Sequence, residues 1–140
     1  SLRISWKKGH ESQFYWQADV PADFSQMERD GGALVMEFMI NKHPRGSVTQ
    51  RMDCGWPCRG EIDVTEFYKS IPLRQRSKVG ISLSCFKKMG VDMEKITSPL
   101  VLVSKDEFEI TFSDVRVIAN ASEDNTIQLC DSEVATLLQD

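Results

Sequence analysis

Apolar and polar residues alternate along much of this chain, which is the pattern of β-strands with one face turned toward a core. The stretch ALVMEFMI, residues 33–40, shows it most clearly. One set of alternate positions carries only large apolar side chains: Leu34, Met36, Phe38 and Ile40. The other set includes Glu37 between Val35 and Met39. We therefore predict a strand with one buried face and one partly covered face.

Other segments have the same two-residue period. They are LRISW, FYWQADV, SVTQRM, KVGISL, PLVLV and FEITFSDVRVI (residues 2–6, 14–20, 47–52, 78–83, 99–103 and 108–118). Turn-forming residues separate the segments at 30–32, 43–46, 54–60 and 88–90. Short strands with turns at regular spacing favour an all-β fold, an antiparallel β-sandwich, over alternating βαβ units.

Helical patterns are scarce, and two segments show one. Asp63 or Thr65 is placed to cap a short helical turn. DSEVATLLQD (residues 131–140) has a capping residue at its start and an apolar stripe, which predicts a C-terminal helix. We expect residues 1–118 to form the sandwich, and residues 119–140 to be a polar segment and helix of the same domain.

Aromatic residues lie within the first strand candidates. Trp6 and Trp16 occur in apolar patterns, so we expect both in the core. Tyr15 and Gln17 fall on the face opposite Trp16, where they would meet solvent or a ligand.

Composition limits the classes of partner. The chain has 140 residues, 41% of them hydrophobic, which suffices for one domain with its own core. Its net charge is −4, with both signs scattered, so it has no basic stripe for nucleic acid or for an anionic membrane. The longest apolar run, residues 33–40, is too short to span a membrane. Because a strand pattern begins directly after Ser1, we expect the chain to be part of a longer polypeptide.

The segment RMDCGWPCRGEID, residues 51–63, contains most of the candidate chemistry. Zinc sites usually combine two close pairs of ligands, and no second pair accompanies Cys54 and Cys58. A thioredoxin-type redox site would need two residues between its cysteines rather than three. A disulfide between Cys54 and Cys58 would instead hold the loop rigid. Pairing of Cys85 with one of them, or with Cys130, is an open alternative.

Trp56 stands among turn formers and polar residues rather than in an apolar pattern. A tryptophan on a rigid loop can stack on the C–H face of a pyranose ring, and the alternative is that it covers one end of the sandwich. Its neighbours Arg51, Asp53, Arg59 and Glu61 could hydrogen-bond to sugar hydroxyls. The simpler interpretation is that Asp53 pairs with Arg51 or Arg59.

Motifs for catalysis and cofactors do not occur. The sequence lacks the nucleophile elbow, the P-loop, the dinucleotide fingerprint and the H-E-x-x-H motif. Asp53, Glu61 and Asp63 are carboxylates, but the sequence shows no further group of catalytic residues that could act with them. We therefore predict no catalytic residue, no metal centre and no cofactor in this chain. A structural Ca²⁺ held by such carboxylates is an alternative that the sequence leaves open.

Four segments follow one another in a recognisable order. They are ALVMEFMINKHPRGSV, RMDCGWPCRGEIDVT, ISLSCFKKMGVDMEKITSPLVL and EITFSDVRV. The most specific positions are Met52, Cys54, Gly55, Cys58 and Gly60, then Leu83, Cys85, Phe86, Gly90, Asp92 and Pro99. From about Trp6 to Val117, the chain resembles the C-terminal domain of bacterial family 3 glycoside hydrolases of the exo-1,3/1,4-β-glucanase (glucan 1,4-β-glucosidase) type.

This resemblance implies a jelly-roll, galactose-binding-like sandwich similar to carbohydrate-binding modules, placed after two catalytic domains of a secreted or periplasmic bacterial enzyme. In such hydrolases the catalytic carboxylates belong to those preceding domains, so we expect this fragment to be inactive alone. The first functional hypothesis is β-glucan binding, with Trp56 as the stacking platform. The second is docking on the catalytic domains and shaping the rim of their active-site pocket, motivated by the apolar outer positions Val35 and Met39. Dimerisation through the same surface is the third.

Overall fold

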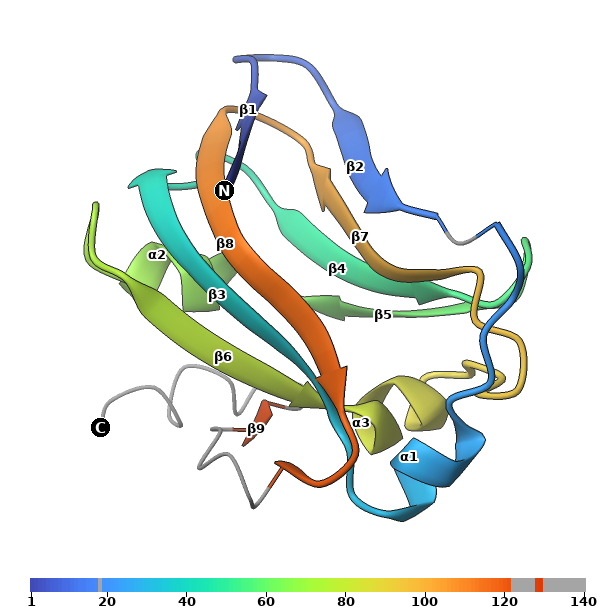
Figure 1. The fold of residues 1–140 in the computed structure, drawn as a ribbon. Helices are drawn as coiled ribbons and strands as arrows, with labels where there is room; N and C mark the ends of the chain where they lie inside the picture. The colour runs from blue at the N-terminus through green and yellow to red at the C-terminus, as the bar shows by residue number, and fades with distance from the viewer. Residues whose placement is uncertain (18, 122–127, 130–140) are drawn as a thin grey trace.

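Two β-sheets packed face to face make up the molecule, whose computed structural model describes residues 1–17, 19–121 and 128–129 (Figure 1). The five-stranded sheet has the order β1-β8-β3-β6-β9 and the four-stranded sheet the order β2-β7-β4-β5. The strands are β1 (Leu2–Trp6), β2 (Ser12–Trp16), β3 (Ala33–Lys42), β4 (Val48–Asp53), β5 (Arg59–Asp63), β6 (Ser77–Ser82), β7 (Ser98–Ser104), β8 (Phe108–Ile118) and β9 (Gln128–Leu129). All pairs are antiparallel except β6 with β9.

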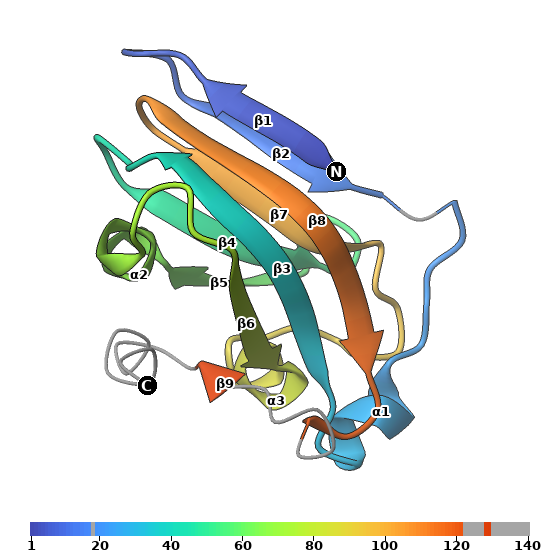
Figure 2. The same ribbon diagram turned by 60° about the vertical axis from the view of Figure 1, so that its left-hand side comes forward.

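The core lies between the two sheets, as the alternation predicts (Figure 2). The even-numbered side chains of β3 from Leu34 to Ile40 are at most 2% exposed. They meet Val48 and Met52 of β4 and Leu100 and Leu102 of β7 in one cluster. The predicted all-β sandwich with short helical turns is therefore confirmed.

The N-terminal segment supplies one edge strand to each sheet. β1 pairs with β8, from Leu2 opposite Phe112 to Trp6 opposite Phe108. β2 pairs with β7, with Tyr15 opposite Val101. Trp6 is buried at 4% exposure and stacks on Phe108, with ring centroids 5.3 Å apart, so the expectation of a core residue holds for it.

The expectation that Trp16 is a core residue is wrong. Its side chain is 36% exposed, although its ring lies 6.0 Å from that of Phe112. The reason is its position, because Trp16 is the last residue of β2, which lies at the edge of the four-stranded sheet. Tyr15, on the opposite face of β2, is 50% exposed.

Within the described ranges, three short helices close the ends of the sandwich. α2 (Thr65–Ser70) follows β5, at the turn that Asp63 and Thr65 predict. Its N-cap is Val64, whose side chain cannot cap the helix; instead Asp63 Oδ1 accepts a hydrogen bond from the Thr65 amide at 2.9 Å. The Thr65 hydroxyl bonds to Val48 of β4.

The other two helices are not predicted by the sequence pattern. α1 (Ser25–Arg29) and α3 (Leu83–Lys88) lie together at the end of the sandwich away from α2 (Figures 1 and 2). The β6 strand stops at Ser82, whose hydroxyl accepts a hydrogen bond from the Ser84 amide at 3.3 Å and so begins α3. The α3 end packs closely on β5, because a Cβ on Gly60 would lie 2.9 Å from the Phe86 carbonyl oxygen.

The outer face of β3 is covered by the chain itself, which corrects one expectation. Val35 is fully buried and clusters with Ala33, Ile118 and Ala121. The Ala121 amide donates to the Gly31 carbonyl at 3.1 Å. Val35 therefore offers no apolar surface to a neighbouring domain, whereas Met39 is half-buried. The predicted helix at 131–140 and Cys130 lie outside the described residues.

Candidate functional site

The loop between β4 and β5 is closed by a disulfide between Cys54 and Cys58. The Cys54 amide donates to the Cys58 carbonyl at 2.9 Å, and the Cys58 amide donates to the Gly55 carbonyl at 2.8 Å. Cys54 is fully buried in the core, which anchors the loop to the sandwich. The Trp56–Pro57 peptide bond is cis, and Gly55 has φ of +88°, a conformation that suits glycine.

The disulfide settles one alternative left open by the sequence. Because Cys54 and Cys58 bond to each other, neither of them pairs with Cys85. Cys85 is itself buried in α3 at 3% exposure.

Trp56, at the tip of this loop, is 68% exposed. Cζ of Arg59 lies over its ring at 4.3 Å from the centroid, and Cζ of Arg51 at 5.4 Å. Cation–π contacts of this kind stabilise the orientation of an exposed ring. Trp56 therefore faces the surface, beside two guanidinium groups, rather than covering the core.

Arg51 connects the loop to the outer face of the four-stranded sheet. Its Nε and Nη2 donate to the two carboxylate oxygens of Asp53 at 2.7 and 3.2 Å, which confirms the predicted pairing. Its Nη2 also reaches Gln13 Oε1 at 3.4 Å. The Arg51 and Asp53 side chains are only 12% and 18% exposed, so this two-bonded pair is held in place.

These groups line a surface hollow of about 360 Å³. Its lining residues are Gln13, Tyr15, Gln17, Arg51, Asp53, Gly55, Trp56, Thr97 and Ser98. The volume lies within the range of small-ligand sites, about 300–1,000 Å³. The structure thus brings three predicted site residues, Trp56, Arg51 and Asp53, into one cavity.

The other two predicted site residues lie beside the hollow. Arg59 stacks on the Trp56 ring and donates a hydrogen bond to the Pro57 carbonyl at 2.8 Å. Glu61 is exposed on β5 opposite Arg51, and it does not line the hollow.

Gln13, Thr97 and Ser98 are site residues that sequence reasoning missed. The two-residue period already places Gln13 on the same face of β2 as Tyr15 and Gln17. What the sequence does not show is the strand order, in which β7 alone separates β2 from β4. Thr97 is bonded to the β4–β5 loop, since its hydroxyl oxygen accepts a hydrogen bond from the Gly55 amide at 3.1 Å.

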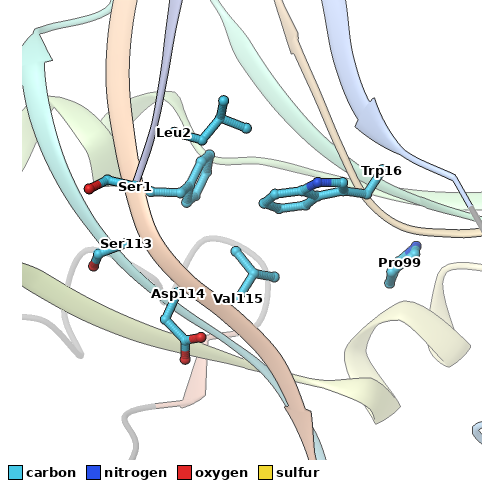
Figure 3. Close-up of a pocket in the computed structure, with 8 residues that line it drawn as sticks. Ser1, Leu2, Trp16, Pro99, Ser113, Asp114 and Val115 are labelled. Atoms are coloured by element: carbon cyan, nitrogen blue, oxygen red, sulfur yellow. The ribbon is translucent and has the colours of Figure 1, made fainter.

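A second hollow, of about 560 Å³, opens between the edges of the two sheets. The Trp16 side chain points across it toward Leu2, with Val115 of β8 on the same side as Leu2 (Figure 3). Its lining also includes Ser1, Pro99, Phe112, Ser113 and Asp114. Asp114 is already paired with Arg116. Few free polar groups converge here, so this hollow suits an apolar side chain better than a sugar.

The hollow beside Trp56 combines an aromatic ring with guanidinium, carboxylate and hydroxyl groups. Within the part of the chain that the structure describes, no three side chains of His, Cys, Asp or Glu are grouped to hold a metal ion. None of the described helices is long and apolar enough to cross a membrane.

The structure is thus an all-β sandwich with a polar hollow beside an exposed tryptophan. Residues 1–117 match the Exop_C family, described as galactose-binding domain-like. The chain therefore belongs to the Exop_C family. A comparison with curated protein sequences found no match.

Solved structures with similar folds come from glucan-degrading enzymes. The extra C-terminal domain of the exo-1,3/1,4-β-glucanase ExoP from a Pseudoalteromonas species matches with a TM-score of 0.70 and 19% identity, over 91% of this chain and 66% of that one. ExoP itself matches with a TM-score of 0.70 and 17% identity, over 94% of this chain and 15% of that one. The family 30 carbohydrate-binding module of the Clostridium thermocellum cellulase CEL9D-CEL44B matches with a TM-score of 0.66 and 18% identity, over 84% and 73%.

At these identities the likeness shows a shared fold. The resemblance to the C-terminal domain of an exo-1,3/1,4-β-glucanase is confirmed by the family and by the ExoP domain. The assignment of a longer enzyme to glycoside hydrolase family 3 stays a prediction.

Proposed function

We propose that this domain binds β-glucan through the hollow between Trp56 and the outer face of the four-stranded sheet. The observation that carries the proposal is the exposed Trp56 ring, held beside the fixed Arg51–Asp53 pair. A glucose ring has C–H bonds on its two faces and hydroxyl groups around its edge. An indole can take the face while guanidinium, carboxylate and hydroxyl groups take the edge.

The domain is proposed to act as a non-catalytic accessory part of a secreted or periplasmic exo-1,3/1,4-β-glucanase. The fold shared with the ExoP domain supports this context, and the family 30 module supports carbohydrate as the ligand class. Catalysis would belong to other domains of the longer chain. Binding is expected to be weak, because one aromatic ring with a few polar partners supplies little free energy beyond the entropic cost of association.

The test is calorimetric titration of the domain with laminari- and cello-oligosaccharides. Trp56→Ala should abolish the heat of binding. Leu73→Ala is the matched control, because Leu73 is another exposed apolar side chain, at 38%, in the segment after α2. Unchanged affinity in Trp56→Ala, or a loss in both variants, would refute this site.

Docking on the catalytic domains of the same polypeptide is the second candidate function, and the apolar hollow of Figure 3 favours it. Leu2 and Trp16 are 41% and 36% exposed there, which leaves apolar surface for a neighbouring domain to cover. Deleting the domain from the longer enzyme would then lower turnover even on small soluble substrates. If the domain only binds glucan, its deletion should lower turnover on polymers and leave turnover on small soluble substrates unchanged.

A further inference from the structure

Tyr15 gives the polar hollow a second exposed aromatic ring. It lies on β2 and Arg51 on β4, and both stand opposite Val101 of the intervening strand β7. Two strand spacings, about 10 Å, therefore separate their backbones. Trp56 lies in the loop beyond β4, so Arg51 comes between the two aromatic residues in strand order.

Arg51 links the two ends of the hollow. Its guanidinium lies near the Trp56 ring and reaches Gln13, which shares the outer face of β2 with Tyr15. Val101 beneath this region is fully buried even though it belongs to the outer face. On the surface between the rings, Arg51 and Gln13 are therefore joined by a hydrogen bond above the buried Val101.

We propose that Tyr15 forms a second aromatic contact, so that the site binds a chain of several β-linked glucosyl units rather than a single sugar. This inference rests on the proposed function. Trp56 takes the face of one unit and Tyr15 the face of another. Between them, hydroxyl groups meet the Arg51–Asp53 pair, the amide of Gln17 and the hydroxyl of Thr97.

The physical reason is that a single exposed ring supplies little free energy beyond the cost of association. A second contact on the same chain is made without a second loss of translational freedom. Affinity should therefore rise with chain length until the ligand reaches both rings, and then level off.

The experiment measures affinity against chain length for the domain and three variants, with cello- and laminari-oligosaccharides of two to six units. Tyr15→Ala should lower affinity for the longest ligands at least about fivefold and leave the shortest ligand that binds unaffected. Tyr15→Phe keeps the ring and should bind nearly as the unaltered domain does. Trp56→Ala should lose binding at every length.

Each outcome decides between the inference and the function on which it rests. If Tyr15→Ala binds every ligand normally while Trp56→Ala does not, the domain binds sugar but Tyr15 is no second contact. An equal loss at all lengths in Tyr15→Ala would also overturn the inference, since it would place both rings at one sugar unit. No binding by the unaltered domain would overturn the proposed function as well. Circular dichroism of each variant checks that it folds.

Discussion

Tyr68 places a hydroxyl group among the buried aromatic rings of the core. Its side chain is fully buried, and its ring lies within 5.5 Å of the ring centroids of Phe38, Phe67 and Phe108. Among the described residues its hydroxyl has no hydrogen-bond partner. Burial raises the pKa of Tyr68 above its ordinary value of 10.0. The residue thus contributes ring packing at the cost of an unpaired hydroxyl group.

Tyr68→Phe should increase the free energy of unfolding by about 1 kcal/mol at neutral pH, because it removes the unpaired hydroxyl and keeps the ring. Above pH 10 the advantage should widen, since the raised pKa means that Tyr68 ionises first in the unfolded chain and so draws the equilibrium toward unfolding. Urea denaturation of both proteins at about pH 7 and about pH 10.5 measures the effect. A less stable Tyr68→Phe would mean that the hydroxyl is hydrogen-bonded in solution.

Asp106 connects two turns at the edge of the molecule. Its Oδ1 accepts hydrogen bonds from the Gly9 amide at 3.0 Å and the Glu107 amide at 2.6 Å. These bonds hold the pKa of the Asp106 carboxyl below its ordinary value of 3.8. The ionised carboxylate therefore ties the turn between β1 and β2 to the turn between β7 and β8.

Asp106→Asn should destabilise the protein at pH 7 and lose that effect as the pH falls. A lowered pKa contributes stability above the ordinary value of 3.8, and the contribution disappears as the pH drops through the lower folded-state value. Thermal unfolding at several pH values between about 2.5 and 7 tests this, at roughly one-unit steps. Asp19→Asn, at an exposed position, serves as the control. A destabilisation that stays constant over the whole range would argue against a role of the charge.

At the scale of elements, the site depends on the conformation of the β4–β5 loop. The disulfide joins residues four apart in sequence, and the loop is further held by the bond from Gly55 to Thr97 and by stacking of Arg59 on Trp56. The sequence predicts this disulfide as one of several alternatives, because spacing alone does not distinguish a bonded pair from two separate thiols.

Replacing both Cys54 and Cys58 by serine should reduce stability by about 2 kcal/mol, the chain-entropy value for so short a loop. It should also weaken glucan binding, because Trp56 would no longer be fixed beside Arg51. Denaturant unfolding and oligosaccharide titration measure the two effects separately. The Leu73→Ala protein is again the reference for binding. Full affinity in the serine variant would show that the cation–π contacts suffice to position Trp56.

Elements also show where sequence reasoning works and where it fails. β3 and β8 are predictable because each has a long two-residue period, with one face buried between the sheets. α3 is not, because Leu83 continues the alternation of β6 although the chain already turns at the Ser82 cap. The prediction that Trp16 is buried is wrong for a different reason. Its exposure depends on the strand order, which places β2 at a sheet edge and which local sequence patterns do not contain.

At the scale of the whole molecule, the strand order is what brings the site residues together. Gln13, Arg51 and Thr97 are far apart in sequence, and they meet because β7 lies between β2 and β4. The loop residues Trp56, Arg51 and Asp53 could be selected from the sequence because they are clustered there. The two-residue period also predicts that Tyr15 and Gln17 of β2 face solvent or a ligand. Their place beside Arg51 could not be predicted, since no short-range pattern specifies which strands become neighbours.

A chain that ends at Ile118 should still fold, with a free energy of unfolding about 2 kcal/mol lower than that of the full chain. It loses the bond from Ala121 to Gly31 and the pairing of β9 with β6, and it exposes the side chain of Val35. Denaturant unfolding of the two chains compares them. Val35→Thr in the full chain is a partial control that puts a polar group into the same cluster. Equal stability would show that residues 119–140 add nothing to the sandwich.

The pairing of β1 with β8 also bears on how the molecule comes together. Leu2 is opposite Phe112, so β1 finds its partner only after the residues between the two strands have left the ribosome. Contacts at such sequence separation make folding slow, on the order of milliseconds to seconds for sandwiches. Until β8 arrives, the backbone edge of β1 is open to other chains. Expression at lower temperature, where chains accumulate more slowly, should therefore favour correct assembly of this domain over aggregation.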